Sequence, residues 1–183
     1  MPVIRAFIGL GITTTINQRL DQDCQQLRNR LGKDHHDRVR WIRPQNRHIT
    51  LLFLGDTPLQ ACLEHWQRLT EHPLHPPSTC QFDQISHFPD AKSRIIALTE
   101  STPSGLLTPL KQAVDQIFSN LLEKPDGKNF KPHITLARIR NPWHFDFPPI
   151  DVDYQLQIKS LGLFQSHLTP VGSNYQLLKE RRF

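Results

Sequence analysis

The sequence predicts an α+β fold in which the strands pair mainly in antiparallel fashion. Strand-like and helix-like segments are mixed along the chain, without the strict alternation that a doubly wound parallel sheet requires. The chain has 183 residues, which is enough to bury a hydrophobic core as one compact unit. One tetrapeptide occurs twice, and this repetition indicates two similar lobes that face each other.

The first half of the chain is expected to contain strands and two helices. An alternating apolar segment at 1–10 predicts the first strand. After a cap region at Thr13, apolar residues recur at helical spacing and predict a helix that ends near residue 31. A second helix is expected to follow Thr57 as its cap, with Pro58 at its first position. Apolar residues between 59 and 69 supply the buried stripe of this second helix, and strands are predicted at 38–43 and 47–54.

A proline-rich connector at 72–77 marks the expected break between the lobes, because three prolines in five residues cannot continue a helix or a central strand. The chain is nevertheless predicted to form a single two-lobed domain over 1–183. Beyond the connector, a helix is expected from Ser104 to residue 121, ended by 124–127. Strands are predicted at 79–88, 94–98, 133–138, 151–168 and 173–182.

The composition favours a polyanionic partner and argues against a membrane protein. The chain carries 22 Lys and Arg against 17 Asp and Glu, a net charge of +5. No apolar run approaches the roughly 18 residues that a membrane helix needs. The N-terminus alternates and has no cleavage site for a leader, so we expect a cytoplasmic protein. We also expect a monomer.

Neither a metal nor a cofactor is expected. Cys24, Cys62 and Cys80 are an odd number at wide spacings and are interpreted as free, buried thiols. His35-His36-Asp37 is interpreted as a solvated turn rather than a metal site, because it has no ligand partner one helical turn away. The sequence also lacks the paired carboxylates that two-metal hydrolysis uses.

The repeated tetrapeptide is the feature that carries the chemistry: His-Ile-Thr-Leu occurs at 48–51 and again at 133–136. In a strand, the histidine and threonine point to one face while the isoleucine and leucine point to the other. A single His-x-Thr is more often a half-buried histidine beside a β-branched neighbour. Two matching copies instead predict a shared cleft that contains two imidazoles and two hydroxyls.

This set of groups suits phosphoryl transfer to water. Histidine has an unperturbed pKa of about 6.5, so one imidazole can deprotonate the nucleophile while the other protonates the leaving oxygen. An in-line displacement needs the base and the acid on opposite sides of phosphorus, which two facing lobes provide. The threonine hydroxyls would donate hydrogen bonds to the non-bridging oxygens.

The sequence around both tetrapeptides resembles the two-histidine phosphoesterase superfamily, whose signature is His-x-(Thr/Ser)-x twice. Within it, the similarity is to the bacterial and archaeal RNA 2′,3′-cyclic phosphodiesterases, once described as RNA 2′-5′ ligases. The similarity spans nearly the whole chain and is carried by residues 5–8, 39–55, 130–138 and 163–178. The chain departs from the family pattern at Gly9-Leu10-Gly11, where the family often has a small residue followed by an acidic one. It also departs at Arg47, where the family often has an apolar residue.

The resemblance implies two pseudo-symmetric lobes, each an antiparallel sheet backed by helices, with a central cleft. It implies hydrolysis of an RNA 2′,3′-cyclic phosphate end, or of a cyclic nucleotide, to a 2′-phosphomonoester without a metal. His48 would protonate the departing 3′ oxygen, and His133 would activate water. Phe7 could stack on a base, but a position in the core is the preferred interpretation.

The resemblance also implies substrate-binding residues. Thr50 and Thr135 carry over as phosphate ligands, and Arg138 matches the arginine that closes the second motif. Strict alternation would place Arg138 on the same face as Ile134, away from the cleft, unless the strand ends or twists there. Two alternative functions stay open: a noncatalytic RNA- or nucleotide-binding module of the same fold, and a reversible 2′-5′ RNA ligase.

Overall fold

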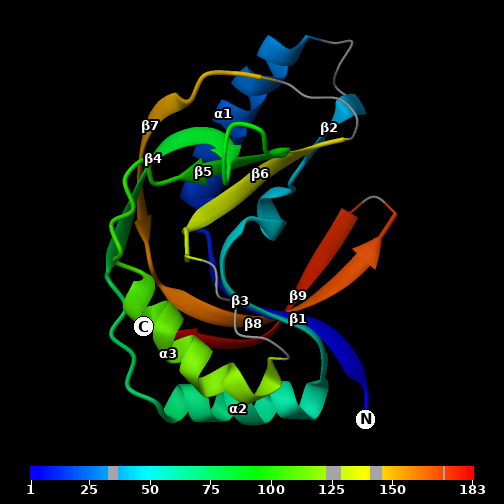
Figure 1. Ribbon diagram of the computed structural model, residues 1–183, viewed down its shortest axis with the longest axis vertical. Coiled ribbons are helices and arrows are strands. Elements are labelled where there is room, and N and C mark those ends of the chain that lie inside the picture. The colour runs from blue at the N-terminus through cyan, green and yellow to red at the C-terminus, as the bar shows by residue number, and fades with distance from the viewer. Residues whose placement is uncertain (33–36, 123–128, 141–145, 171) are drawn as a thin grey trace.

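A computed structural model describes residues 1–32, 37–122, 129–140, 146–170 and 172–183. Over these residues the predicted α+β class is confirmed (Figure 1). The strands are β1 (Val3–Gly11), β2 (Val39–Trp41), β3 (His48–Pro58), β4 (Thr79–Phe88), β5 (Ile95–Thr99), β6 (His133–Ile139), β7 (Ile150–Gln157), β8 (Ser160–Thr169) and β9 (Gly172–Arg182). The helices are α1 (Thr14–Leu31), α2 (Leu59–Glu71) and α3 (Thr108–Phe118), with 3-10 turns η2 (Pro44–Asn46) and η3 (Ser119–Leu121).

The described strands form one sheet with the order β7-β4-β5-β6-β3-β1-β8-β9, and β2 pairs with β6. All of the pairs are antiparallel. The β6 half contains β2, β4, β5, β6 and β7, and the β3 half contains β1, β3, β8 and β9. The two halves meet where β3 lies beside β6, and a single residue pair, Ile49 with Ile134, registers the two strands. The predicted lobes are therefore joined through one continuous sheet.

The helices divide between the two halves (Figure 1). Helix α1 packs on the β6 half, where the Arg19 guanidinium lies 4.3 Å from the centre of the Tyr154 ring on β7. Helices α2 and α3 cover the β3 half, and Arg181 on β9 donates a 2.5 Å hydrogen bond to the Leu69 carbonyl of α2. The predicted cap of α1 is confirmed, because the Thr13 hydroxyl accepts a 3.4 Å hydrogen bond from a backbone N–H.

The predicted cap of α2 was wrong, and the helix begins at Leu59, one residue after Pro58. Strand β3 continues to Pro58, and Thr57 is part of it, opposite Ile4 of β1. The Thr57 hydroxyl donates to the Leu54 carbonyl at 2.9 Å and so does not cap the helix. The chain can bend within the strand because Gly55 adopts a φ of 67°, which a side chain would disfavour.

Two further boundaries differ from the prediction. Helix α3 begins at Thr108, because the backbone N–H and hydroxyl of Ser104 both bond to the Glu100 carboxylate in a separate turn. The long strand predicted at 151–168 is two strands, because β7 pairs with β4 in the β6 half and β8 pairs with β1 in the β3 half. The chain has to change halves between them.

The segment 72–77 connects α2 with β4, which belong to different halves. Residues 124–127, predicted to end the third helix, lie outside the described part of the chain. Within the described ranges, none of the helices combines the length and the hydropathy that a membrane span needs.

Candidate active site

The two copies of the tetrapeptide begin the two strands that join the halves, and both open on one cavity. This cavity has a volume of about 930 Å³. All of the residues predicted for the site line it, namely His48, Thr50, His133, Thr135 and Arg138. The structure therefore brings together side chains that lie far apart in the sequence.

The register of β3 and β6 explains how the motif residues face one another. Ile49 and Ile134 are partners in the antiparallel pair, and both are fully buried. One residue outward, this register sets each histidine across from the other strand's threonine. His48, Thr50, His133 and Thr135 are half-buried on the opposite face from the isoleucines. Each wall of the cavity thus contributes one imidazole and one hydroxyl.

Strand β3 contains a β-bulge inside its motif. Against β1, Leu52 pairs with Ile8 and Thr50 pairs with Gly9, so Leu51 is an extra residue with no partner. A bulge shifts the alternation of side chains by one position. Phe53, which would otherwise share the face of Ile49, lies at the cavity instead and is 67% exposed.

Strand β6 contains the same bulge at the equivalent position. Against β5, Ala137 pairs with Ile96 and Thr135 pairs with Ala97, which leaves Leu136 without a partner. The shifted alternation brings the exposed Arg138 to the cavity. Strict alternation would have placed it on the buried face, and the bulge is the physical reason that it does not lie there.

Both histidines are held in the same way. The Nδ1 atom of His48 lies 2.7 Å from the Asn46 carbonyl oxygen, and that of His133 lies 3.0 Å from the Lys131 carbonyl oxygen. A carbonyl oxygen only accepts, so Nδ1 is assigned as the donor on each ring. In the neutral imidazole, Nε2 is then left with a free lone pair for chemistry.

Aromatic rings support each imidazole from behind. The Phe88 ring stacks on His133 with centroids 3.8 Å apart, and Phe7 lies 4.6 Å from His48. Tyr175 meets His48 edge-on at 5.0 Å. Phe7 is 1% exposed, so it is a core residue that packs against His48 and not a stacking surface for a base.

Burial controls the protonation of both imidazoles. Burial lowers the pKa of His48 to about 4, despite the opposing effect of the Asn46 carbonyl, and the charges of His133 and Arg138 lower it further. Burial also lowers the pKa of His133, with Arg138 acting in the same direction. In the free protein at neutral pH, both rings are therefore uncharged.

Positive side chains surround this pair. The cavity lining contains five Lys or Arg residues and, within the described part of the chain, no Asp or Glu: Arg40, Arg43, Lys111, Lys131 and Arg138. One of the five is neutralised, because Lys111 Nζ lies 2.5 Å from the Asp115 carboxylate. The cavity is suited to an anion, which the remaining cations would attract.

The described residues contain no group of three or more His, Cys, Asp or Glu that could hold a metal ion. His35 and His36 lie outside the described residues. Cys24, Cys62 and Cys80 are free and buried, as predicted. Burial raises the pKa of all three thiols, that of Cys24 to about 11, so they are poor nucleophiles at neutral pH.

Comparison with known proteins gives the family. The model of the 2′-5′ RNA ligase superfamily matches residues 16–157. The chain belongs to this superfamily. It is 28% identical to an RNA 2′,3′-cyclic phosphodiesterase of Aquifex aeolicus, over 98% of this chain and 97% of that protein. The resemblance inferred from the sequence is thereby confirmed.

Solved structures share the fold. A crystal structure from Thermus thermophilus has a TM-score of 0.78 at 25% identity and covers 98% of this chain and 97% of its own. Escherichia coli LigT in complex with 3′-AMP has a TM-score of 0.76 at 20% identity, over 99% of this chain and 98% of its own. The α+β fold with its large antiparallel sheet is thus the same as in these structures.

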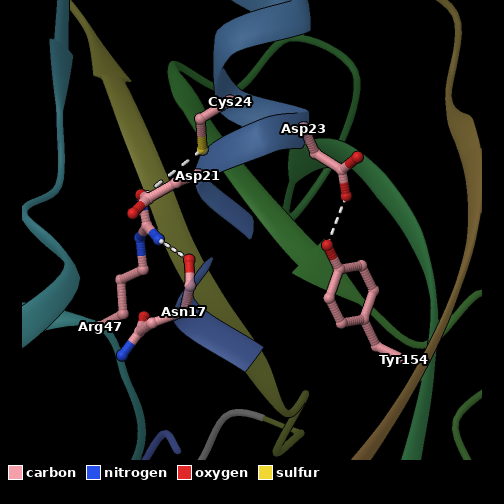
Figure 2. Close-up of polar contacts among 6 residues, drawn as sticks. All are labelled: Asn17, Asp21, Asp23, Cys24, Arg47 and Tyr154. Carbon is pink, nitrogen blue, oxygen red and sulfur yellow. Dashed lines mark hydrogen bonds and ion pairs between the residues drawn. The ribbon is translucent and has the colours of Figure 1, made fainter. Parts of the chain in front are cut away.

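Arg47, where the resemblance implied an apolar residue, anchors one element inside the protein (Figure 2). Its side chain is only 3% exposed and forms a 2.7 Å ion pair with Asp21 of α1. It also donates to the Asn17 carbonyl at 3.1 Å and lies 3.7 Å from the Cys24 sulfur. Arg47 therefore fixes the start of β3, next to His48, against α1.

Gly9 of β1 makes room for His48. A Cβ atom at this position would lie 2.9 Å from the Ile49 carbonyl oxygen and 3.5 Å from the His48 ring. Any side chain here would push β3 away from β1. The glycine thus allows the imidazole to sit against β1.

Sequence reasoning missed Phe53, Phe88 and Tyr175. Phe53 could have been found by comparing the two motif copies, because it is the fifth residue after His48. Arg138, which was predicted for the site, is likewise the fifth residue after His133. Phe88 and Tyr175 reach the histidines from β4 and β9, and no local pattern connects them with the motifs.

Proposed function

We propose that this superfamily member hydrolyses the 2′,3′-cyclic phosphate end of RNA to a 2′-phosphomonoester without a metal, with His48 as general acid and His133 as general base. The observation that carries the proposal is the pair of imidazoles on opposite halves of one cationic cavity, each with Nδ1 occupied by a carbonyl and Nε2 left for chemistry. The name of the Aquifex relative, an RNA 2′,3′-cyclic phosphodiesterase, supports a cyclic phosphate of RNA as the substrate.

The proposed reaction is a single in-line displacement at phosphorus. Nε2 of His133 takes a proton from water as its oxygen bonds to phosphorus, and the bond from phosphorus to the 3′ oxygen breaks. His48 gives its Nε2 proton to that oxygen, so a 3′ hydroxyl and a 2′ phosphate remain. His133 ends protonated and His48 neutral, and exchange with solvent restores the starting state.

The other groups of the cavity stabilise the negative charge. The hydroxyls of Thr50 and Thr135 would donate to the non-bridging oxygens, and Arg138 would provide a positive charge beside them. The anionic substrate also favours the imidazolium form, which raises the pKa of His48 toward the range where it can act as an acid. The exposed ring of Phe53 offers a stacking surface for the terminal base. Escherichia coli LigT, which shares this fold, has been crystallised with 3′-AMP, and this supports a nucleotide as the ligand.

The reaction requires both halves, since each supplies one histidine. We therefore propose that the two lobes act as one domain over 1–183 and that a single copy, a monomer, suffices. An RNA substrate also implies that the protein acts in the cytoplasm.

The identity of the product tests the proposed function. An RNA oligonucleotide with a 2′,3′-cyclic phosphate end should give the 2′-phosphate and no 3′-phosphate, as resolved by phosphorus NMR. The rate should be unchanged in excess chelator, because histidines supply the acid and the base. An RNA with a 3′ hydroxyl end serves as the control and should not change. Loss of the activity in chelator, restored by added metal, would refute the metal-free mechanism.

The pH dependence of hydrolysis should follow the lowered pKa values. One imidazole must be protonated and the other neutral, so kcat/KM should be bell-shaped. Because kcat/KM reports the free protein, its maximum should lie below pH 6.5, between the pKa of His48, about 4, and that of His133. The optimum of kcat should lie at higher pH, since bound phosphate favours the protonated rings. Initial rates over about pH 4 to 9 check this, and a flat profile would contradict the mechanism.

A further inference from the structure

A second concave surface adjoins the catalytic cavity, and arginines dominate it. This arginine groove has a volume of about 660 Å³. It shares Arg40, Phe88, Pro89, Ile95 and Arg138 with the catalytic cavity and adds Arg94 and Arg140. Within the described residues, no Asp or Glu lines it. The groove is therefore a continuation of the cationic cavity that leads away from the histidines.

The groove is built on two antiparallel strands with matching sequences. Residues 38–40 read Arg-Val-Arg, and residues 138–140 read Arg-Ile-Arg. Val39 and Ile139 are partners and are both buried, so the flanking arginines of each strand share the exposed side. The bulge at Leu136 is what turns the second triplet to this side.

Backbone hydrogen bonds fix the arginines relative to one another. The Arg140 N–H donates to the Arg38 carbonyl at 2.8 Å, and the Ile139 N–H donates to the Arg94 carbonyl at 2.7 Å. Arg40 lies directly opposite Arg138 in the register. The guanidinium groups thus extend from three neighbouring segments of one rigid sheet.

This arrangement costs stability in the absence of an anion. Like charges directly opposite each other in a sheet are destabilising. Four arginines line the groove, namely Arg40, Arg94, Arg138 and Arg140. In the described ranges, none of these four forms an ion pair with a carboxylate, whereas Arg47 and Lys111 elsewhere each have one. A phosphate group bound in the groove would supply the compensating negative charge, and the guanidinium fork matches a phosphate group in shape and charge.

We propose that the arginine groove binds the phosphates of the RNA strand immediately upstream of the cyclic end. The proposal rests on the proposed function, because a terminal phosphate held between the histidines leaves the preceding nucleotides to follow the shared wall into the groove. The preferred substrate is then the end of an RNA chain and not a free cyclic nucleotide. Arg94 and Arg140 bind only the chain, since they line the groove and not the catalytic cavity.

The double variant Arg94→Ala/Arg140→Ala tests the groove. Its matched control is Arg5→Ala/Arg68→Ala, which removes the same charge from exposed residues that line neither cavity. Binding of a fluorescently labelled RNA tetranucleotide with a 2′-phosphate end is measured by anisotropy at several salt concentrations. The groove variant should weaken binding by about 10-fold and lower the slope of log K against log salt by about 1.4, that is, about 0.7 for each of two lost phosphate contacts. The control should match the wild type.

Catalysis provides the second measurement. For 2′,3′-cyclic AMP, kcat/KM of the groove variant should stay within about twofold of wild type, while for the cyclic-ended tetranucleotide it should fall by about 10-fold. Unchanged RNA binding and salt slope in the groove variant would overturn the inference and leave the proposed function intact. Equal competition by an acidic peptide would overturn the assignment to RNA. If the wild type hydrolyses neither substrate but the groove variant still loses RNA binding, the proposed function fails while the groove stands.

Discussion

Replacement of either motif histidine by alanine is expected to lower kcat for a cyclic-ended RNA by about 10²- to 10⁴-fold, the usual contribution of a positioned acid or base. His48→Ala removes the proton for the 3′ oxygen, and His133→Ala removes the base that activates water. Rates are measured at saturating RNA, and the thermal midpoint Tm of each variant shows whether it still folds. His75→Ala, at an exposed position outside the cavity, is the matched control and should keep full activity.

The double variant separates a cooperating pair from two independent groups. If acid and base act in the same step, His48→Ala/His133→Ala should lose little more than either single variant, because each group depends on the other. Two losses that multiply would show that the histidines act in separate steps. Activity that survives in a folded single variant would remove that histidine from the mechanism.

Replacement of either motif threonine by valine is expected to lower kcat by about 10²- to 10³-fold, as the loss of one donor to a developing negative charge does elsewhere. Valine keeps the branched shape of Thr50 or Thr135 but removes the hydroxyl. Rates are compared with those of Thr70→Val, an exposed position on α2 that lies away from the cavity.

The two threonine variants should behave alike, because Thr50 and Thr135 occupy equivalent positions in the two motifs on either side of the Ile49 and Ile134 pair. A change in KM with kcat unaltered would mean that a hydroxyl binds the ground state and the transition state equally. Such a result would contradict the assignment of that threonine to charge stabilisation.

Most of the elements could be predicted from sequence periodicity because their patterns are local. The cap at Thr13, the strand at 79–88 and the twin motifs are all recognisable within a few residues. The division of 151–168 into two strands was not predictable, since it depends on which distant strands β7 and β8 pair with. Thr57 lies in a strand and not at a helix cap because it pairs with β1, and this pairing extends β3 beyond the turn that Gly55 and Asp56 predict.

The site could be predicted only as far as simple alternation holds. His48, Thr50, His133 and Thr135 keep the period of two, so their common face follows from the sequence. The bulges at Leu51 and Leu136 break that period, and no residue in either motif marks them. Arg138 and Phe53 reach the cavity only through these bulges. Phe88 and Tyr175 come from distant strands, which the sequence alone does not bring to the histidines.

The single residue pair that registers β3 against β6 also determines how the molecule can move. Ile49 and Ile134 lie next to His48 and His133, so a rocking of one half against the other would pivot beside the reacting groups. Points near a pivot travel least, whereas the distant rims of the halves have the longest lever arm. Such a rocking would therefore change the width of the cavity mouth more than the spacing of the two imidazoles.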